Sequence, residues 1–295
     1  MELSQLRMVK AVAECGSIAR AARQLHCVPS NITTRIKQLE SELGTALFTR
    51  SGRGLRISAA GLVFIGYTEQ ILTLVEQAKR AVQPQAVPTG TLRIGAIESC
   101  ATGRLPSLLA TFHQRYPHVQ LELVTGQWAQ LLDDVLHHRL DGAVVAVDVD
   151  QPKLSTTALY HEELVIIAGA QAAPLTSLHD VPQHTVFMWP RGCPYRAALE
   201  NWLDTHQLDT HKITYANWGS IIGCVSAGAG IALVPQGMLE HLGSSAQVTR
   251  YGFNALTPVL NRFVWHSESG SHGARDAFAA LLTEQLGDVA PAGFN

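Results

Sequence analysis

Short polar and basic side chains gather between residues 30 and 56, in a stretch that begins PSNITTRIKQ and ends RSGRGLRIS. Hydroxyl and amide side chains can approach base edges or phosphates, and arginines or lysines can pair with phosphates. Glycines in the second segment permit a tight turn that would direct arginines toward the backbone or the minor groove. The chemistry that this pattern predicts is contact with duplex DNA. The candidate DNA-binding residues are Ser30, Asn31, Thr33, Thr34, Arg35, Lys37, Arg50, Arg53 and Arg56.

The charge distribution favours a polyanionic partner for the same segment. The chain has 295 residues and a formal net charge of −2. Residues 1–58 hold nine basic and four acidic residues, a net charge of +5, whereas the other residues hold 13 basic and 20 acidic ones, a net charge of −7. A basic head on an acidic body is typical of a nucleic-acid-binding segment. An ordinary solvated surface could carry the same charges. The positions of the basic residues are therefore needed to distinguish a DNA-binding segment from such a surface.

Helical periodicity predicts three short helices that position these side chains. The first spans roughly residues 3–14, and the second, at 18–25, follows Gly16 and a capping Ser17. Pro29 suits the first turn of the third helix, and Gly44 ends it. Two helices with a turn of this length form a helix-turn-helix, whose second helix enters the major groove. The residues of the third helix that we expect to face inward are Ile32, Ile36, Leu39 and Leu43.

Residues 15–61 resemble the winged helix-turn-helix signature of LysR-type transcriptional regulators. The resemblance implies a sequence-specific DNA-binding protein, modulated by a small-molecule effector, that works as a homodimer or homotetramer. The family's usual Gln before the proline is Val28 here, and its usual Ser/Arg pair is Thr33-Thr34, so the operator sequence does not carry over. The matching residues are Gly16-Ser17, Ala21-Ala22, Leu25-His26, Pro29-Ser30, Thr33, Ile36, Leu39-Glu40, Leu43-Gly44, Leu47-Phe48, Arg50 and Ala60-Gly61.

A long apolar helix is predicted from residue 59 to residue 82, followed by the proline-containing joint QPQAVPTG. A helix that is apolar over more than a narrow stripe needs a partner. The partner could be the helix's own domain. We favour an antiparallel helix–helix contact between two copies, which the resemblance also implies. Twofold pairing would present two recognition helices and therefore require a pseudo-palindromic site.

Short apolar runs alternate with helical patterns after residue 90, which predicts parallel α/β sheets. The predicted fold is an N-terminal winged helix-turn-helix, a long linker helix and a C-terminal two-lobed α/β effector domain of the periplasmic-binding-protein type. The predicted DNA-binding domain is 1–58, the linker helix and hinge are 59–90, and the effector domain is 91–295. Lobe I would contain about 91–160 and 265–295, and lobe II about 161–264.

Small ligands of α/β lobes bind beyond the carboxyl ends of strands, against helix N-termini. Arginine with aromatic neighbours could hold a carboxylate, whereas tryptophan with Glu98 could hold an amine. Helix capping or core packing is the ordinary alternative for each residue taken singly. The segments RGCPYR and ESCATGRLP also resemble a branch of the family linked to putrescine-utilisation control. The candidate effector-binding residues are Glu98, Ser99, Thr102, Gln127, Trp128, Cys193, Tyr195, Arg196, Asn217 and Trp218.

An α/β enzyme and a periplasmic solute-binding protein are the two alternative classes for this chain. The glycines of SAGAGIALVP follow a predicted helix and precede a strand, the reverse of a dinucleotide fingerprint. Cys193 has no identifiable His and acid partners, and no P-loop or G-x-S-x-G occurs, so we expect no catalysis, cofactor or metal. Five scattered cysteines indicate free thiols in a reducing cytosol. MELSQLRMVK is no secretory signal and no apolar run would span a membrane, so we expect a cytoplasmic protein.

Overall fold

The computed structural model describes residues 1–51, 54–81, 87–243, 247–253 and 256–287. The chain divides into two compact units, one formed chiefly by residues 1–84 and the other chiefly by residues 85–295. Two predicted features, Arg53 and positions 83–86 of the proline-containing joint, lie outside the described residues. Among the described helices, none is both long enough and apolar enough to cross a bilayer.

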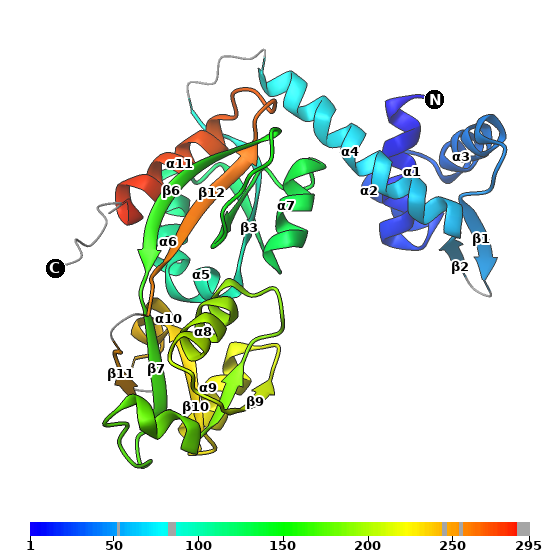
Figure 1. Cartoon of the computed structure of the whole chain (residues 1–295). Helices are drawn as coiled ribbons and strands as arrows, with labels where there is room; N and C mark the ends of the chain where they lie inside the picture. The colour runs from blue at the N-terminus through cyan, green and yellow to red at the C-terminus, as the bar shows by residue number, and fades with distance from the viewer. Residues whose placement is uncertain (52–53, 82–86, 244–246, 254–255, 288–295) are drawn as a thin grey trace. The chain divides into compact units, whose positions relative to one another are not determined.

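The N-terminal unit is a winged helix-turn-helix followed by a long helix (Figure 1). Its first three helices pack on one another and on the start of the wing around a small aliphatic core. The wing is a two-stranded antiparallel sheet. The elements are α1 (Leu3–Cys15), α2 (Ile18–Gln24), α3 (Pro29–Leu43), β1 (Phe48–Ser51), β2 (Gly54–Ile57) and α4 (Ala59–Ala81).

The local sequence explains where these helices begin and end. Gly16 and Gly44 follow α1 and α3 with φ of 63° and 66°, a left-handed conformation that glycine adopts without strain. Pro29 occupies the first turn of α3, as predicted. The predicted cap Ser17 precedes α2, but its side chain makes no capping hydrogen bond. The prediction that Leu43 faces inward is wrong, because Leu43 lies in the last turn of α3 and is 39% exposed.

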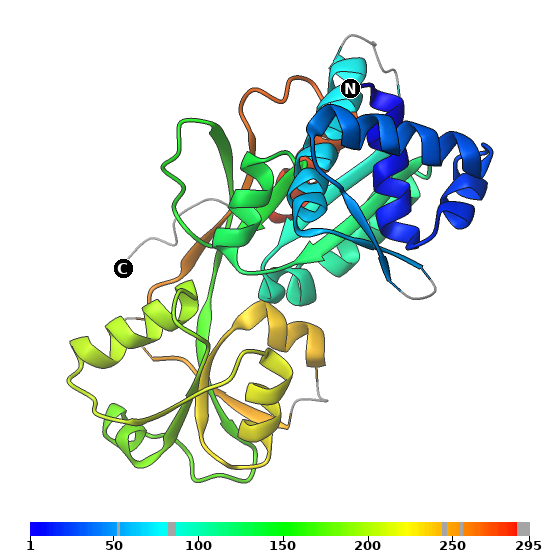
Figure 2. The ribbon, with the colours of Figure 1, turned by 90° about the vertical axis from the view of Figure 1, so that its right-hand side faces the viewer.

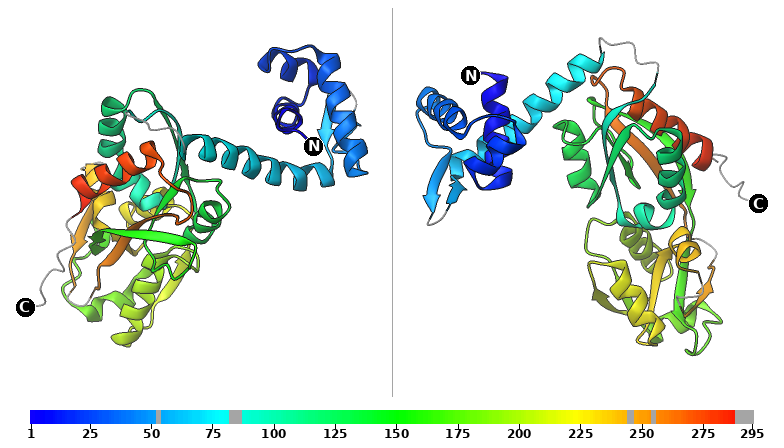
Figure 3. Two further views of the ribbon diagram at one scale, coloured as in Figure 1. Left: turned by 90° about the horizontal axis from the view of Figure 1, so that it is seen from above. Right: turned by 180° about the vertical axis from the view of Figure 1, so that it is seen from behind.

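Helix α4 packs on α1 with one side and presents apolar side chains to solvent on another. It is one continuous helix of 23 residues, seen from above in Figure 3. It contacts α1, and Thr68 is fully buried on its inner side. Side chains at positions 63, 67 and 74 share a face because they are four and seven residues apart. The large apolar side chains exposed on α4 are Leu62, Val63, Tyr67 and Leu74.

The C-terminal unit contains two five-stranded sheets, one in each lobe (Figure 2). The first sheet has the order β4-β3-β5-β12-β6. Its first three strands in the sequence, β3, β4 and β5, run parallel, and β12 is antiparallel to both β5 and β6. Helices α6, α7 and α11 pack against strands of this sheet or against each other. The elements of this lobe are β3 (Gly90–Ala96), α5 (Glu98–Gly103), α6 (Leu105–Arg115), β4 (Val119–Thr125), α7 (Trp128–Leu136), β5 (Gly142–Val145), β6 (Leu154–Glu162), β12 (Val259–His266) and α11 (Gly273–Leu286).

The second sheet has the order β11-β7-β10-β8-β9. Strand β8 runs parallel to β9 and β10, whereas β7 is antiparallel to β10 and β11. Helices α8 and α9 both contact β10, and α10 packs on α5 of the first lobe. The elements of this lobe are β7 (Leu164–Gly169), the 3-10 helix η1 (Leu178–Gln183), β8 (Thr185–Met188), α8 (Pro194–Thr205), β9 (His211–Thr214), α9 (Trp218–Ser226), β10 (Ile231–Pro235), α10 (Gln236–Leu242) and β11 (Val248–Tyr251).

The chain passes between the lobes twice, from β6 to β7 and from β11 to β12. The prediction of parallel sheets is therefore incomplete, because the returning chain adds antiparallel strands to both of them. Strand β12, which comes late in the chain, lies in the first sheet. We accordingly propose lobe boundaries near residues 163 and 258, in place of those expected at 160 and 265.

Candidate functional site

The first turns of α3 form the candidate nucleic-acid interface. Their polar side chains lie opposite the buried side of the helix, where Ile32, Ile36 and Leu39 enter the core. The first backbone N–H groups of a helix lack acceptors one turn earlier within it, so this end of α3 can also face a phosphate. The candidate residues of α3 that are exposed are Ser30, Asn31, Thr34 and Lys37, and those that are half-buried are Thr33 and Arg35.

Two of these side chains already have partners within the unit. The hydroxyl of Thr33 donates to the carbonyl of Pro29 at 3.0 Å, which leaves its oxygen as an acceptor. The guanidinium of Arg35 pairs with the carboxylate of Glu2 at 3.2 Å. A phosphate contact from Arg35 would therefore compete with an existing ion pair, whereas Thr34 and Lys37 project from the exposed side of the helix.

The register of the wing separates two of the predicted arginines. Arg50 lies opposite Leu55, and Arg56 lies opposite Thr49. Directly opposed residues of an antiparallel pair point to one face, and successive residues alternate between faces. Leu55 packs against the core, so Arg50 is on the core side of the wing and Arg56 is on its other side. Both side chains are exposed, but they lie on opposite faces of the wing, so they would contact different parts of the DNA.

A cavity of about 280 Å³ lies between the two lobes and is the candidate effector site. Its lining comes from four segments at the ends of strands that belong to parallel pairs. They are 97–99 after β3, 125–128 at the end of β4, 189–195 after β8, and Ala216 with Trp218 after β9. The carboxyl ends of parallel strands meet at one edge of a sheet. Each lobe therefore contributes two adjacent strand ends, and the cavity lies where those two edges face each other.

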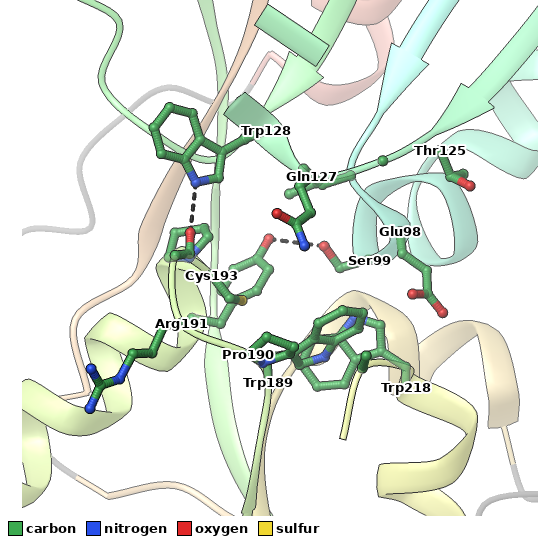
Figure 4. Close-up of a pocket in the computed structure, with 16 residues that line it drawn as sticks. Glu98, Ser99, Thr125, Gln127, Trp128, Trp189, Pro190, Arg191, Cys193 and Trp218 are labelled. Atoms are coloured by element: carbon green, nitrogen blue, oxygen red, sulfur yellow. Dashed lines mark hydrogen bonds between the residues drawn. The ribbon is translucent and has the colours of Figure 1, made fainter. Parts of the chain in front are cut away.

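Hydrogen bonds cross from one lobe to the other around this cavity, and Figure 4 draws those made by Ser99 and Trp128. The hydroxyl of Ser99 donates to the hydroxyl of Tyr195 at 3.2 Å, in a buried position. The indole N–H of Trp128 donates to the carbonyl of Gly192 at 2.6 Å. The backbone N–H of Trp218, in the first turn of α9, donates to the carboxylate of Glu98. The same side chains thus line the cavity and hold the lobes together.

Aromatic rings form much of the cavity wall in the second lobe. The ring centroids of Trp189 and Trp218 are 5.2 Å apart and tilted by 58°, and those of Tyr195 and Trp218 are 6.3 Å apart. Trp128 reaches across from the first lobe. Such rings supply apolar surface and a negative face to a ligand.

The carboxylate of Glu98 and the guanidinium of Arg191 are the ionised groups that the cavity lining contains within the described chain. Arg191 is exposed, and Figure 4 shows its guanidinium directed away from Glu98 and the tryptophans. Burial raises the pKa of Glu98, against the opposing effect of the hydrogen bond from Trp218. Burial also raises the pKa of Cys193 and of Tyr195, so both stay neutral at physiological pH.

The structure brings seven of the ten candidate effector residues to the cavity. Thr102 lies in α5 away from the lining. Asn217 caps α9, its side-chain oxygen accepting from the backbone N–H of Ser220 at 2.7 Å. Arg196 pairs with Glu200. Sequence reasoning missed Trp189, which follows β8 directly and could have been found by the same strand-end rule. The lining residues that were not predicted are Ile97, Thr125, Gly126, Trp189, Pro190, Arg191, Gly192, Pro194 and Ala216.

A buried ion pair lies beside the cavity at the junction of the lobes. Arg104, just after α5, donates from two nitrogens to both carboxylate oxygens of Glu162, each at 3.1 Å. The side chain of Glu162 is 3% exposed and also accepts the backbone N–H of Gly237 at 2.9 Å. Arg104 pairs in addition with Glu240 of α10 at 3.3 Å. This network joins α5, the end of β6 and the start of α10.

The cysteines near the cavity lack the surroundings of a nucleophile. Burial raises the pKa of the Cys100 thiol to about 12, and burial raises the pKa of Cys193 as well. A reactive cysteine has the opposite shift, toward the thiolate. The glycines of the SAGAGIALVP segment lie between α9 and β10, the order that excludes a dinucleotide-binding turn. No group of three or more His, Cys, Asp or Glu that could hold a metal ion occurs among the described residues.

The fold and these two sites define a class of protein: a DNA-binding unit joined to an α/β unit with a ligand-sized cavity between its lobes. Residues 3–62 match the family described as bacterial regulatory helix-turn-helix protein, lysR family, and residues 85–287 match the LysR substrate binding domain. The chain therefore belongs to the LysR family of transcriptional regulators, with a DNA-binding helix-turn-helix and a domain for a small-molecule effector.

Relatives and solved structures agree with this assignment. The chain is 36% identical over 285 residues to the uncharacterized HTH-type transcriptional regulator YusT of Bacillus subtilis, covering 96% of each chain. It is 34% identical to the HTH-type transcriptional regulator GltR of the same species, covering 90% of this chain and 96% of GltR. Its fold is similar to that of full-length CbnR complexed with its target DNA, with a TM-score of 0.71 at 20% identity, covering 98% of this chain and all of CbnR. A full-length OxyR variant from Pseudomonas aeruginosa gives the same TM-score, 0.71, at 20% identity, covering 97% of this chain and 94% of OxyR.

Proposed function

We propose that this regulator contacts DNA through α3 and its wing, pairs with a second copy through α4, and responds to a small molecule bound between its α/β lobes. The observation that carries the proposal is that one cavity is lined by strand ends of both lobes and crossed by their hydrogen bonds. A ligand there changes the relative stability of two lobe arrangements only if it binds them with different affinity. The working boundaries are 1–58 for DNA binding, 59–90 for the linker and 91–295 for effector binding.

The polar first turns of α3 support the assignment of base contacts. The position of Thr33 and Thr34 in the first turns of α3 supports base contacts by these two residues, and the exposure of Lys37, Arg50 and Arg56 supports phosphate contacts. We infer that Thr33 or Thr34 changed to alanine relaxes sequence choice. The arginines changed to alanine weaken binding to all sequences and reduce its salt dependence.

The apolar stripe of α4 supports a twofold assembly. Val63, Tyr67 and Leu74 lie on one exposed face, and a second copy in antiparallel orientation can cover them. Val63→Glu places a charge in that contact and is expected to shift the chain toward monomer in sedimentation velocity. Val87→Glu is the matched control, since Val87 is 57% exposed against 64% for Val63 and lies outside α4. An unchanged oligomeric state in Val63→Glu contradicts this interface. The assembly is a dimer, or a tetramer built from two such dimers.

Three observations support binding rather than catalysis in the cavity. The thiol pKa values of Cys100 and Cys193 are raised, so neither forms a reactive thiolate. The side chain of Asn217 is used to cap α9, and that of Arg196 is used in an ion pair. We infer that the protein has no enzymatic activity and acts in the cytoplasm, where its DNA is. An α/β enzyme or a solute-binding protein with an unrelated basic head is the alternative that the family assignment disfavours.

The test is a genome-wide footprint of the purified full-length protein, repeated with a panel of metabolites. The expected result is a set of protected sites whose length or hypersensitive positions change with one class of compound. Thermal denaturation with the same panel reports direct binding. A footprint that never changes, with no compound shifting the thermal transition, contradicts the effector role.

A further inference from the structure

The charges around the interlobe cavity restrict the chemistry of its ligand. Arg196 is the residue that would have received a carboxylate, but its guanidinium is held by three groups of its own lobe. It donates to Glu200 at 2.8 Å, to the carbonyl of Trp189 at 2.7 Å and to the hydroxyl of Thr214 at 3.2 Å. Arg191 is exposed and directed away from the lining tryptophans. The cavity therefore offers no guanidinium to an anionic ligand from these two positions.

Glu98 has the opposite relation to the cavity. It is half-buried in the lining and receives the backbone N–H of Trp218, and no side-chain ion pair of Glu98 occurs among the described residues. Figure 4 shows its carboxylate extending toward Trp218. The negative charge of a partly buried carboxylate that has one neutral donor is stabilised when a cation binds beside it.

The aromatic wall next to this carboxylate fits the same kind of ligand. The ring centroid of Trp218 lies 5.2 Å from that of Trp189 and 6.3 Å from that of Tyr195, and the backbone of Trp218 also donates to Glu98. A cation that pairs with the carboxylate is held near ring faces, which attract it electrostatically. The volume of about 280 Å³ is at the small end of ligand sites.

We propose that the effector is a small organic monocation, a protonated amine whose ammonium group pairs with Glu98 against the tryptophan wall. The proposal rests on the proposed function of the cavity as the effector site. One acidic side chain lines the cavity within the described residues, so a monoamine is favoured over a diamine of equal length. A second ammonium group would lose its hydration without a second carboxylate.

The test is a titration of the full-length protein, followed by tryptophan fluorescence and by calorimetry. The probes are n-butylammonium, 1,4-diaminobutane, n-butanol and butyrate, which share a chain length and differ in charge. The expected order of affinity is n-butylammonium, then 1,4-diaminobutane, with n-butanol and butyrate much weaker. Glu98→Gln keeps the shape of the side chain and is expected to weaken n-butylammonium binding roughly 10- to 100-fold, the loss of one charge-assisted contact.

Glu163→Gln is the matched control, because Glu163 is exposed and does not line the cavity. It is expected to bind n-butylammonium like the unaltered chain. Circular dichroism and thermal denaturation verify that both variants are folded.

Results other than those expected would contradict the cation proposal, the preference for a monocation, or the effector role of the cavity. Binding of butyrate or n-butanol that is insensitive to Glu98→Gln overturns the cation proposal and leaves the cavity as the effector site. Tighter binding of 1,4-diaminobutane than of n-butylammonium overturns the preference for a monocation. If none of the four probes binds, the cation proposal fails. If, in addition, no metabolite alters the DNA footprint, the proposed effector function fails as well.

Discussion

Arg104→Met tests whether the buried ion pair at the lobe junction stabilises the α/β unit. In the variant, the carboxylate of Glu162 keeps the backbone N–H of Gly237 and loses both guanidinium contacts. Breaking a buried pair by removing one partner costs about 3–5 kcal/mol, because a charge is left uncompensated. The side chain of Arg104 is itself 28% exposed, so water repays part of that cost and we expect a loss of about 3 kcal/mol. For a unit of this size the loss lowers the Tm by roughly 6–12 °C.

The assay is chemical and thermal denaturation of the full-length chain, following the transition of the α/β unit. Arg115→Met is the matched control, because it breaks the exposed pair that Arg115 forms with Glu284 at 2.7 Å. Solvent screens that pair, so its loss should change stability far less. Adding Glu162→Gln to Arg104→Met should restore part of the stability, since it removes the stranded charge. Equal effects of Arg104→Met and Arg115→Met, or no recovery in the double variant, would refute the reasoning.

Three further outcomes are expected. Gly230→Ala should destabilise the second lobe by about 1–3 kcal/mol in urea denaturation, because its Cβ would clash with the carbonyl oxygen of Thr185 in β8. Gly223→Ala, with nothing within 4 Å of its Cβ, should stabilise α9 by up to about 1 kcal/mol. Arg56→Ala should reduce the slope of log affinity against log salt in gel shifts by about 0.9, and Arg35→Ala by less, because an acidic partner already holds Arg35. Acidification through the raised pKa of Glu98 should weaken n-butylammonium binding in calorimetry, because the protonated carboxyl no longer pairs with a cation, and Glu98→Gln should abolish that dependence. The other titratable side chains that line the same cavity are Arg191, Cys193 and Tyr195.

A different result would contradict each of these three predictions. A stable Gly230→Ala variant would contradict the tight packing of β10 on β8. Equal salt slopes for the two arginine variants would contradict their different surroundings. A binding constant that is independent of pH in the unaltered chain would remove Glu98 from the site.

The sequence was sufficient for the winged helix-turn-helix because each of its helices is amphipathic and begins or ends at a residue with a physical reason to be there. Pro29, Gly16 and Gly44 occupy the predicted positions. Leu43 was misplaced because apolar periodicity continues to the last turn of α3, where the bundle no longer covers the helix. Periodicity describes a helix face and does not report where its partner ends.

The sequence predicts the α/β unit in outline. The elements missing from that prediction are β6, β11 and α10, which depend on contacts between residues distant in sequence. Strand β6 reads LSTTALYHE, with polar residues on a strand that pairs along its whole length with β12. Strand β11 and helix α10 are short, so neither gives a clear period. Their conformations depend on tertiary pairing, which overrides weak local preference.

In the cavity, the strand-end rule found segments more reliably than individual residues. It selected all four lining segments, but within them Arg196 and Asn217 serve their own helix. Both roles could have been read from the sequence. Arg196 precedes Glu200 by four residues, the spacing of a helical ion pair, and Asn217 immediately precedes α9, where asparagine is a preferred cap.

The most direct test of the account is the binding of the full-length protein to genomic DNA fragments as a function of salt concentration. The account predicts protection of two half-sites about one helical turn apart, with an affinity that falls steeply as salt rises and a shallower fall in Arg56→Ala. Indifference to genomic fragments at low salt, or protection of a single half-site by a monomer, would contradict it.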